Sequence, residues 1–210
     1  IARNTGILNS KGDYIAFLDA DDSWVESKLS EVSDFISASH SIPNVIFNQA
    51  RIVSGSNASN RIRPRNYKQE NIPEYLFIKR GFIQTSCMIV ANGLDVYFDE
   101  SLKRHQDYQF CIDLAAHYKF HFIALPLTNY KEGSIAQLRL KESSDFSLQW
   151  IERNKVVISR DSYYGFRALK LTSKHFMEGY FILGVYVFFV NFLKITFNNK
   201  LKLIYAFFKK

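Results

Sequence analysis

The feature of this sequence that most limits its fold is an alternation of two kinds of segment between residues 14 and 127. Short apolar runs bounded by turn residues or acids are typical of buried strands. Between them, apolar residues recur at helical spacing, and over 25–39 these are Val25, Leu29, Val32, Phe35 and Ile36. Strands alternating with helices predict an α/β fold with a mixed or parallel sheet.

The expected elements follow from these patterns and from the turn residues at their ends. We predict strands at 14–19, 45–53, 85–90 and 119–127, and Pro126 should end the last one. We predict helices at 2–10, 25–39, 74–81 and 106–118, with Ser23 as an N-cap of the second and Gly81 closing the third. The polar stretch 54–71 is expected to be a turn-rich loop.

From about residue 145 the strand signal stops and only helices are expected. The stretch 180–197 is strongly apolar but contains Asn191 and Lys194, and about 20 apolar residues are needed to cross a bilayer. The pattern favours an interfacial tail on an anionic membrane surface over a span or a buried helix, because lysines also follow it. We expect one region over 1–140 and a C-terminal helical region over 141–210.

The charge balance favours anionic partners. The 210 residues include 27 Lys and Arg against 20 Asp and Glu, which gives a net charge of +7. Phosphates, nucleic acid and acidic lipid all suit such a chain. The basic run 61–68 contains one aromatic residue, Tyr67, so stacking of nucleic-acid bases is not expected there. Cys87 and Cys111 lie far apart in apolar runs, which indicates buried free thiols and a reducing compartment.

Three acids, Asp19, Asp21 and Asp22, follow the first apolar run directly. In open α/β sheets, ligands bind outside the carboxyl ends of strands. Carboxylate oxygens suit Mg²⁺ or Mn²⁺, and Mg²⁺ is usually held by one or two carboxylates together with substrate phosphates. Capping of the following helix would account for one acid but hardly for three. An EF-hand loop is excluded, because Trp24 and Ser30 occupy the positions that require Gly and Glu.

The stretch ARNTGILNSKGDYIAFLDADDSW, residues 2–24, resembles the signature of the family 2 glycosyltransferases, which have the GT-A fold. The resemblance implies that Asp21, with help from Asp22, binds the divalent cation that neutralises the diphosphate of a sugar nucleotide. It places Asp19 near the ribose or in the second shell of the metal. It also implies that Arg3 and Asn4 organise the nucleotide pocket.

The segment LKRHQDYQFCIDLA, residues 102–115, resembles the part of the family that provides the catalytic base at a helix start. The resemblance gives this role to Asp107. A capping acid is the alternative, and Asp99, Glu100 and Asp113 compete for the role. His105 and Gln106 could shape the acceptor pocket or simply pack.

Two further segments match the family more loosely. GFIQTSCMIV, residues 81–90, resembles the acceptor-lining region, so Thr85 and Ser86 could face the acceptor. NYKEGSIA, residues 129–136, resembles a flexible segment that follows the last strand. Lys131 is then a candidate diphosphate contact, with an exposed loop lysine as the alternative. Arg61, Arg63, Arg65 and Lys68 could face a lipid diphosphate or could simply be solvated.

Together these features predict a metal-dependent, inverting glycosyltransferase of bacterial surface-polysaccharide synthesis, such as lipopolysaccharide or capsule. The expected partners are a nucleotide-sugar donor, a saccharide or polyprenyl-diphosphate-linked acceptor, and the cytoplasmic face of the inner membrane. The family's first strand–helix units do not precede Ile1, so we expect an N-terminal portion to be missing. The alternatives are a Mg²⁺-dependent nucleotidyl- or phosphotransferase and an inactive membrane-bound fragment without a complete donor site.

Overall fold

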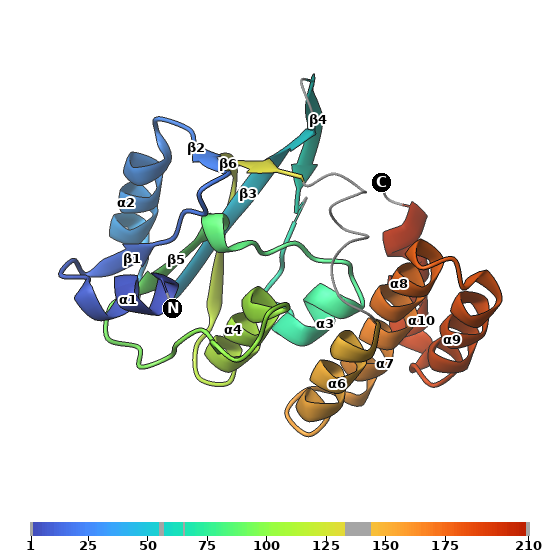
Figure 1. Cartoon of the computed structure of the whole chain (residues 1–210). Coiled ribbons are helices and arrows are strands. Elements are labelled where there is room, and N and C mark those ends of the chain that lie inside the picture. The colour runs from blue at the N-terminus through green and yellow to red at the C-terminus, as the bar shows by residue number, and fades with distance from the viewer. Residues whose placement is uncertain (1, 55–56, 65, 133–143, 209–210) are drawn as a thin grey trace. The chain divides into compact units, whose positions relative to one another are not determined.

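The computed structural model describes residues 2–54, 57–64, 66–132 and 144–208, and the chain forms two compact units (Figure 1). The first unit combines Ile1–Gln69 with Phe82–Gly133, and the second combines Glu70–Gly81 with Ser134–Lys210. The segment Glu70–Gly81 therefore belongs with the C-terminal helices, although strands precede and follow it in the sequence.

The first unit is built on a mixed sheet, as its sequence predicts. Neighbouring strands follow the order β1-β5-β3-β6-β2, with β4 paired to β3. The pair β3–β6 is parallel, and the other described pairs are antiparallel. The strands are β1 (Tyr14–Ala16), β2 (Ser23–Trp24), β3 (Val45–Ser54), β4 (Asn57–Arg63), β5 (Met88–Ala91) and β6 (Phe120–Lys131).

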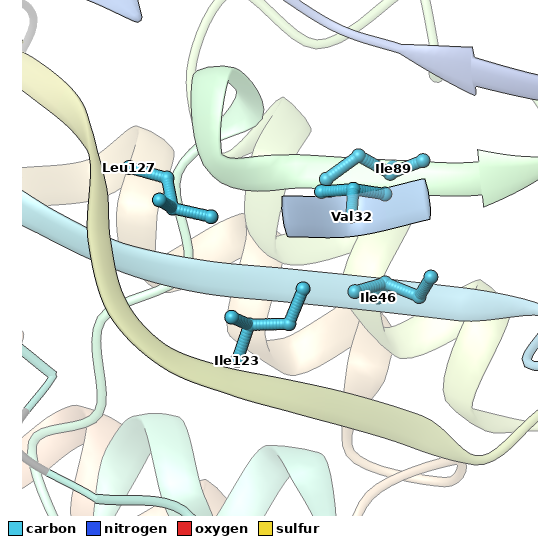
Figure 2. Close-up of a cluster of buried hydrophobic side chains, with 5 residues drawn as sticks. All are labelled: Val32, Ile46, Ile89, Ile123 and Leu127. Carbon is cyan, nitrogen blue, oxygen red and sulfur yellow. The ribbon is translucent and has the colours of Figure 1, made fainter. Parts of the chain in front are cut away.

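Helices cover both faces of this sheet. Successive side chains of a strand point to opposite faces, so Met88 and Ile89 of β5 mark the two sides. Ile89 packs with Val32 of α2 and with apolar residues of β3 and β6 (Figure 2). On the other side, the Cys111 sulfur of α4 lies 3.7 Å from the Met88 sulfur. The helical elements of this unit are α1 (Ala2–Asn9), α2 (Lys28–Ala38), the 3₁₀ turn η1 (Thr85–Cys87) and α4 (Gln106–Ala115).

The second unit is helical in its described residues, as the sequence predicts. Its aromatic centre is made by Phe77, Trp150 and Phe166, whose rings lie 5.1–6.2 Å apart. No helix in the described part of the chain is long and apolar enough to cross a membrane. The helical elements are α3 (Ile72–Phe77), α6 (Ser144–Asn154), α7 (Arg160–Phe166), η2 (Arg167–Leu171), α8 (Thr172–Met177), α9 (Phe181–Leu193) and α10 (Phe197–Phe208).

The start of α2 differs from the prediction. Ser23 lies in β2, where it pairs with Asn129 of β6, so it is not the N-cap. The helix begins at Lys28, after Ser27. Its buried face also differs, because Lys28 is fully buried whereas Leu29 is 59% exposed.

One strand was not predicted, and another extends beyond its predicted limit. The polar stretch that was expected to be a loop contains β4, which pairs with the second half of β3 through contacts such as Arg51 with Ile62. Pro126 does not end β6, which continues to Lys131. The ladder between β3 and β6 shifts register on both sides of the Gln49–Pro126 pair, and this irregularity accommodates a residue that has no N–H to donate.

Candidate active site

The three acids of the first unit lie on a tight turn between two strand ends. The Asp22 N–H donates to the Asp19 carbonyl at 3.1 Å and closes the turn. Before it, the Phe17 N–H donates to the Met88 carbonyl, which extends the pairing of β1 with β5. After it, the Asp22 carboxylate accepts the Lys131 N–H at 2.8 Å, at the end of β6. The turn is therefore fixed at both ends by the sheet.

Ser86 holds this turn from beneath. Its hydroxyl oxygen accepts the Asp19 N–H at 3.0 Å, and its hydroxyl also hydrogen-bonds to the Asp22 carboxylate. Ser86 is fully buried in the 3₁₀ turn η1. The sequence pattern suggested an acceptor contact for this residue, and the structure gives it hydrogen bonds to two of the three acid positions.

Arg3 joins the acid turn to the predicted base. Its Nη2 lies 2.7 Å from the Asp19 Oδ1, and its Nη1 lies 3.4 Å from the Asp107 Oδ1 and 3.1 Å from the Gln106 Oε1. The guanidinium also sits 5.0 Å from the centre of the Phe98 ring, a favourable cation–π distance. One side chain of α1 thus connects the first acid after β1 with the first turn of α4.

Asp107 is held in a largely enclosed position, with 27% of its side chain exposed. Burial raises the pKa of its carboxyl, and the negative charges of Asp19 and Asp22 raise it further. The Thr85 hydroxyl, which donates to the Asp107 Oδ1 at 2.7 Å, and the Arg3 guanidinium oppose this rise in pKa. These opposing effects leave the carboxyl with a higher pKa than an exposed aspartate, which suits a group that must accept a proton.

The competing acids make other contacts. Asp99 accepts the Ser101 N–H and hydroxyl, Glu100 accepts the Asn4 amide, and Asp113 accepts the Gln109 amide. Among the acids of the described segments that compete for the base role, Asp107 is the one that Arg3 links to Asp19 of the acid turn. The geometry therefore favours Asp107 over its competitors.

Asn4 lies on α1 beside Arg3 and binds the backbone of Phe98, the residue whose ring Arg3 contacts. Its Nδ2 donates to the Phe98 carbonyl at 2.8 Å, and its Oδ1 accepts the Phe98 N–H at 2.8 Å. This two-way bond fixes α1 to the chain that leads toward α4. Its predicted part in a nucleotide pocket stays a prediction.

The carboxylates of the turn are ligands that suit a hard divalent cation. Within the described ranges, no three His, Cys, Asp or Glu side chains lie close enough together to hold a metal ion by themselves. Asp21 is exposed. Burial raises the pKa of Asp22, and the charges of Asp21 and Asp19 add to this rise. A cation here would offset that repulsion, with a bound diphosphate completing its ligands.

Lys131 is the last residue of β6 and is exposed, and its backbone N–H donates a hydrogen bond to the Asp22 carboxylate. The structure therefore places this candidate diphosphate contact next to the acid turn. The rest of the predicted flexible segment, residues 133–136, lies outside the described residues.

His105, which precedes α4, has a left-handed backbone with φ 62°.

A buried lysine under the turn was missed in the sequence. The Lys28 Nζ donates to the Ser86 carbonyl at 2.7 Å and to the Thr128 hydroxyl at 3.1 Å, and it lies 4.5 Å from the Trp24 ring centre. Burial lowers the pKa of Lys28 to about 8, although Asp22 favours its charged form. The available signal was its helical spacing, since a residue three positions after Val25 and four before Val32 shares their face.

Comparisons with known proteins identify the family of the chain. The sequence model of Glycosyl transferase family 2 matches residues 1–105. Over 187 residues the chain is 35% identical to the amylovoran biosynthesis glycosyltransferase AmsB of Erwinia amylovora, covering 85% of this chain and 62% of that protein. It is also 28% identical over 199 residues to the uncharacterized glycosyltransferase MJ1057 of Methanocaldococcus jannaschii, covering 90% of this chain and 64% of that protein. The chain thus spans less than two thirds of the length of these relatives.

Proposed function

Because this chain belongs to the family 2 glycosyltransferases, we propose that it transfers a sugar from a nucleotide-sugar donor to a saccharide acceptor, with inversion at the sugar carbon. The observation that carries the proposal is the bridge made by Arg3 between Asp19 and Asp107. Such a bridge keeps the donor-side acids and a base close together, as displacement at one carbon requires.

In this proposal Asp107 accepts the proton of the acceptor hydroxyl as its oxygen attacks the sugar carbon. The bond from that carbon to the diphosphate oxygen breaks, and the nucleoside diphosphate leaves with the bonding electrons. Thr85 and Arg3 hold the Asp107 carboxylate in position and favour its charged form. Arg3 also fixes Asp19, which we assign to the nucleotide side of the site.

We further propose that Asp21 and Asp22 hold Mg²⁺ or Mn²⁺ together with the diphosphate of the donor. A divalent cation at this point stabilises the negative charge that develops on the leaving group. The exposed Asp21 is open to such a ligand, and the exposed Lys131 beside Asp22 is suited to a diphosphate oxygen. Arg3 and the acid turn would face the nucleotide, with Asn4 keeping α1 in place.

The name of the Erwinia relative connects that protein with the biosynthesis of amylovoran. We propose that this chain acts in a similar pathway, on a saccharide that is free or carried on a polyprenyl diphosphate. The apolar stretch 180–197 and the lysines around it support a location at the cytoplasmic face of the inner membrane.

A donor screen with the full-length protein and Mn²⁺ tests the transferase proposal. We expect release of a nucleoside diphosphate that stops with a chelator and falls by roughly 10²-fold or more in Asp21→Ala. The matched control is Asp34→Ala, on the exposed side of α2. Release of pyrophosphate would indicate a nucleotidyltransferase, and full activity of Asp21→Ala would remove the metal assignment.

The same assay separates the base from its neighbours. We expect Asp107→Asn to lower kcat by roughly 10²–10⁴-fold, because the acceptor proton then has no carboxylate to receive it. Asp113→Asn, six positions along the same segment, should retain activity, since Asp113 contacts Gln109. Equal losses in the two variants would contradict the assignment of Asp107.

A further inference from the structure

Helix α9 has a continuous apolar stripe on its exposed side. Ile182, Val185, Tyr186, Phe189 and Leu193 occupy positions i, i+3, i+4, i+7 and i+11, which puts them on one face of the helix. All five are exposed, from 48% for Val185 to 88% for Ile182. A helix that merely packed on its own unit would place polar residues on this face, so the stripe requires its own explanation.

The opposite side of α9 is the one that packs within the second unit. Gly184 and Asn191 are buried, and Phe188 and Phe192 pack against a core cluster that includes Leu169 and Leu203. A Cβ at Gly184 would lie 2.4 Å from the Phe176 ring, so α8 and α9 are in close contact there. The exposed stripe is therefore a second apolar face, separate from the face that stabilises the fold.

Helix α10 repeats this arrangement. Phe197, Leu201, Ile204 and Tyr205 are 41–73% exposed and share one face, at positions i, i+4, i+7 and i+8. Leu203 is fully buried in the core cluster of the unit. Two consecutive helices thus each keep one face for the fold and leave a second apolar face exposed.

The charges of this region are all of one sign. Residues 180–208 include Lys194, Lys200 and Lys202 and no acid. Lys194 and Lys202 are exposed, and Lys200 is half-buried. A second copy of the chain docked here by a two-fold axis would bring these lysines together without an acidic partner, which is unfavourable. An anionic surface is the complementary partner.

The length of α9 indicates whether it could cross a lipid bilayer or would lie on its surface. Helix α9 has 13 residues, about 20 Å at 1.5 Å per residue, whereas the hydrocarbon core of a bilayer is about 30 Å thick. We propose that the exposed stripes of α9 and α10 lie in the headgroup region of an anionic lipid bilayer, with apolar side chains inserted and lysines at the phosphates. The inference rests on the second unit alone and does not depend on the proposed transferase activity.

Vesicle co-sedimentation with the full-length protein tests the proposal. We expect binding to vesicles of phosphatidylcholine with about 30% phosphatidylglycerol, and binding that is weaker by about tenfold or more to phosphatidylcholine alone or at 0.5 M salt. The double variant Ile182→Ser, Phe189→Ser should lose binding by about tenfold or more. The double variant Val156→Ser, Val157→Ser is the matched control, because those residues are 89% and 65% exposed outside the stripes.

Circular dichroism of both variants verifies that each remains folded. Equal loss of binding in the two double variants, or no binding of the wild type to anionic vesicles, would overturn the proposal. The proposal would also be overturned if the wild type were a dimer, the stripe variant were a monomer, and neither protein bound vesicles. The stripes would then join two copies of the chain. Release of nucleoside diphosphate from the donor is measured without vesicles, so failure here is distinguishable from failure of the proposed function.

Discussion

At the scale of single residues, the site combines ionisable side chains whose pKa values are set by their surroundings. Asp107 and Asp22 each have a raised pKa because burial disfavours their charged forms, and the neighbouring acids add to the effect. Arg3 and Thr85 act in the opposite direction on Asp107. Lys28 beneath the turn has the reverse shift, with its pKa lowered to about 8 by burial.

The shift of Lys28 predicts a pH dependence of stability. Between about pH 8 and the ordinary lysine value near 10.5, the unfolded chain binds a proton that the folded chain has released. The contribution of Lys28 to the free energy of unfolding therefore rises with pH in this window, by about 1–3 kcal/mol. Urea unfolding at pH 7.5 and pH 10 should show this rise in the wild type and a smaller one in Lys28→Met.

The matched control for this prediction is Lys11→Met, because Lys11 is exposed in the turn before β1. It should keep the pH dependence of the wild type, and comparison with it removes the contribution of tyrosines that titrate at high pH. Identical pH dependence in Lys28→Met and Lys11→Met would show that Lys28 has no shifted pKa in the folded protein.

At the scale of elements, the second unit depends on a close contact between α3 and α7. A Cβ at Gly165 of α7 would lie 2.7 Å from the Phe77 carbonyl oxygen and 2.5 Å from the Ile78 Cδ1. The carbonyl belongs to the backbone of α3 and cannot rotate away, so the two helices would have to separate.

We therefore expect Gly165→Ala to lower the free energy of unfolding by about 1–3 kcal/mol, even though alanine is the better helix former. Urea unfolding followed by circular dichroism measures the change. Gly6→Ala in α1 is the control, since nothing lies within 4 Å of its added Cβ, and it should be neutral or slightly stabilising. A Gly165→Ala variant as stable as Gly6→Ala would contradict the close packing.

At the scale of the whole molecule, the chain enters the second unit twice. The segment Glu70–Gly81 contributes to it from the middle of the first unit's sequence, and the remainder follows from Ser134. Within the segment, Phe77 is 1% exposed and Ile78 is fully buried, against residues such as Trp150 and Leu169. The second unit is consequently not a tail that can be removed by a single cut.

Deleting residues 144–210 should therefore expose the apolar side of α3. We expect the shortened chain to bind a hydrophobic dye strongly and to aggregate in size-exclusion chromatography, because the exposed patch has lost its partners. Adding Phe77→Ser and Ile78→Ser to the shortened chain should reduce both effects. A monodisperse shortened chain with little dye binding would show that α3 does not need the C-terminal helices.

The sequence by itself determined the local features. The apolar runs and their turns indicated the strands of a mixed α/β sheet and the change to helices near residue 145. The motif in residues 2–24 was sufficient to show the resemblance to the family. The position of Asp107 at a helix start supported its prediction as the catalytic base. These features depend on neighbours within a few residues, which is the range that periodicity and turn chemistry report.

The tertiary structure decided which residues that are remote in sequence contact one another. Arg3 contacts Asp107 across 104 positions of sequence, and Lys28 contacts the Thr128 hydroxyl across 100. The burial of Lys28 in place of Leu29, the pairing of β4 and the continuation of β6 past Pro126 also depend on strands that are remote in sequence. Such contacts are set by sheet register and helix docking, and a one-residue shift in register would move each side chain to the other face.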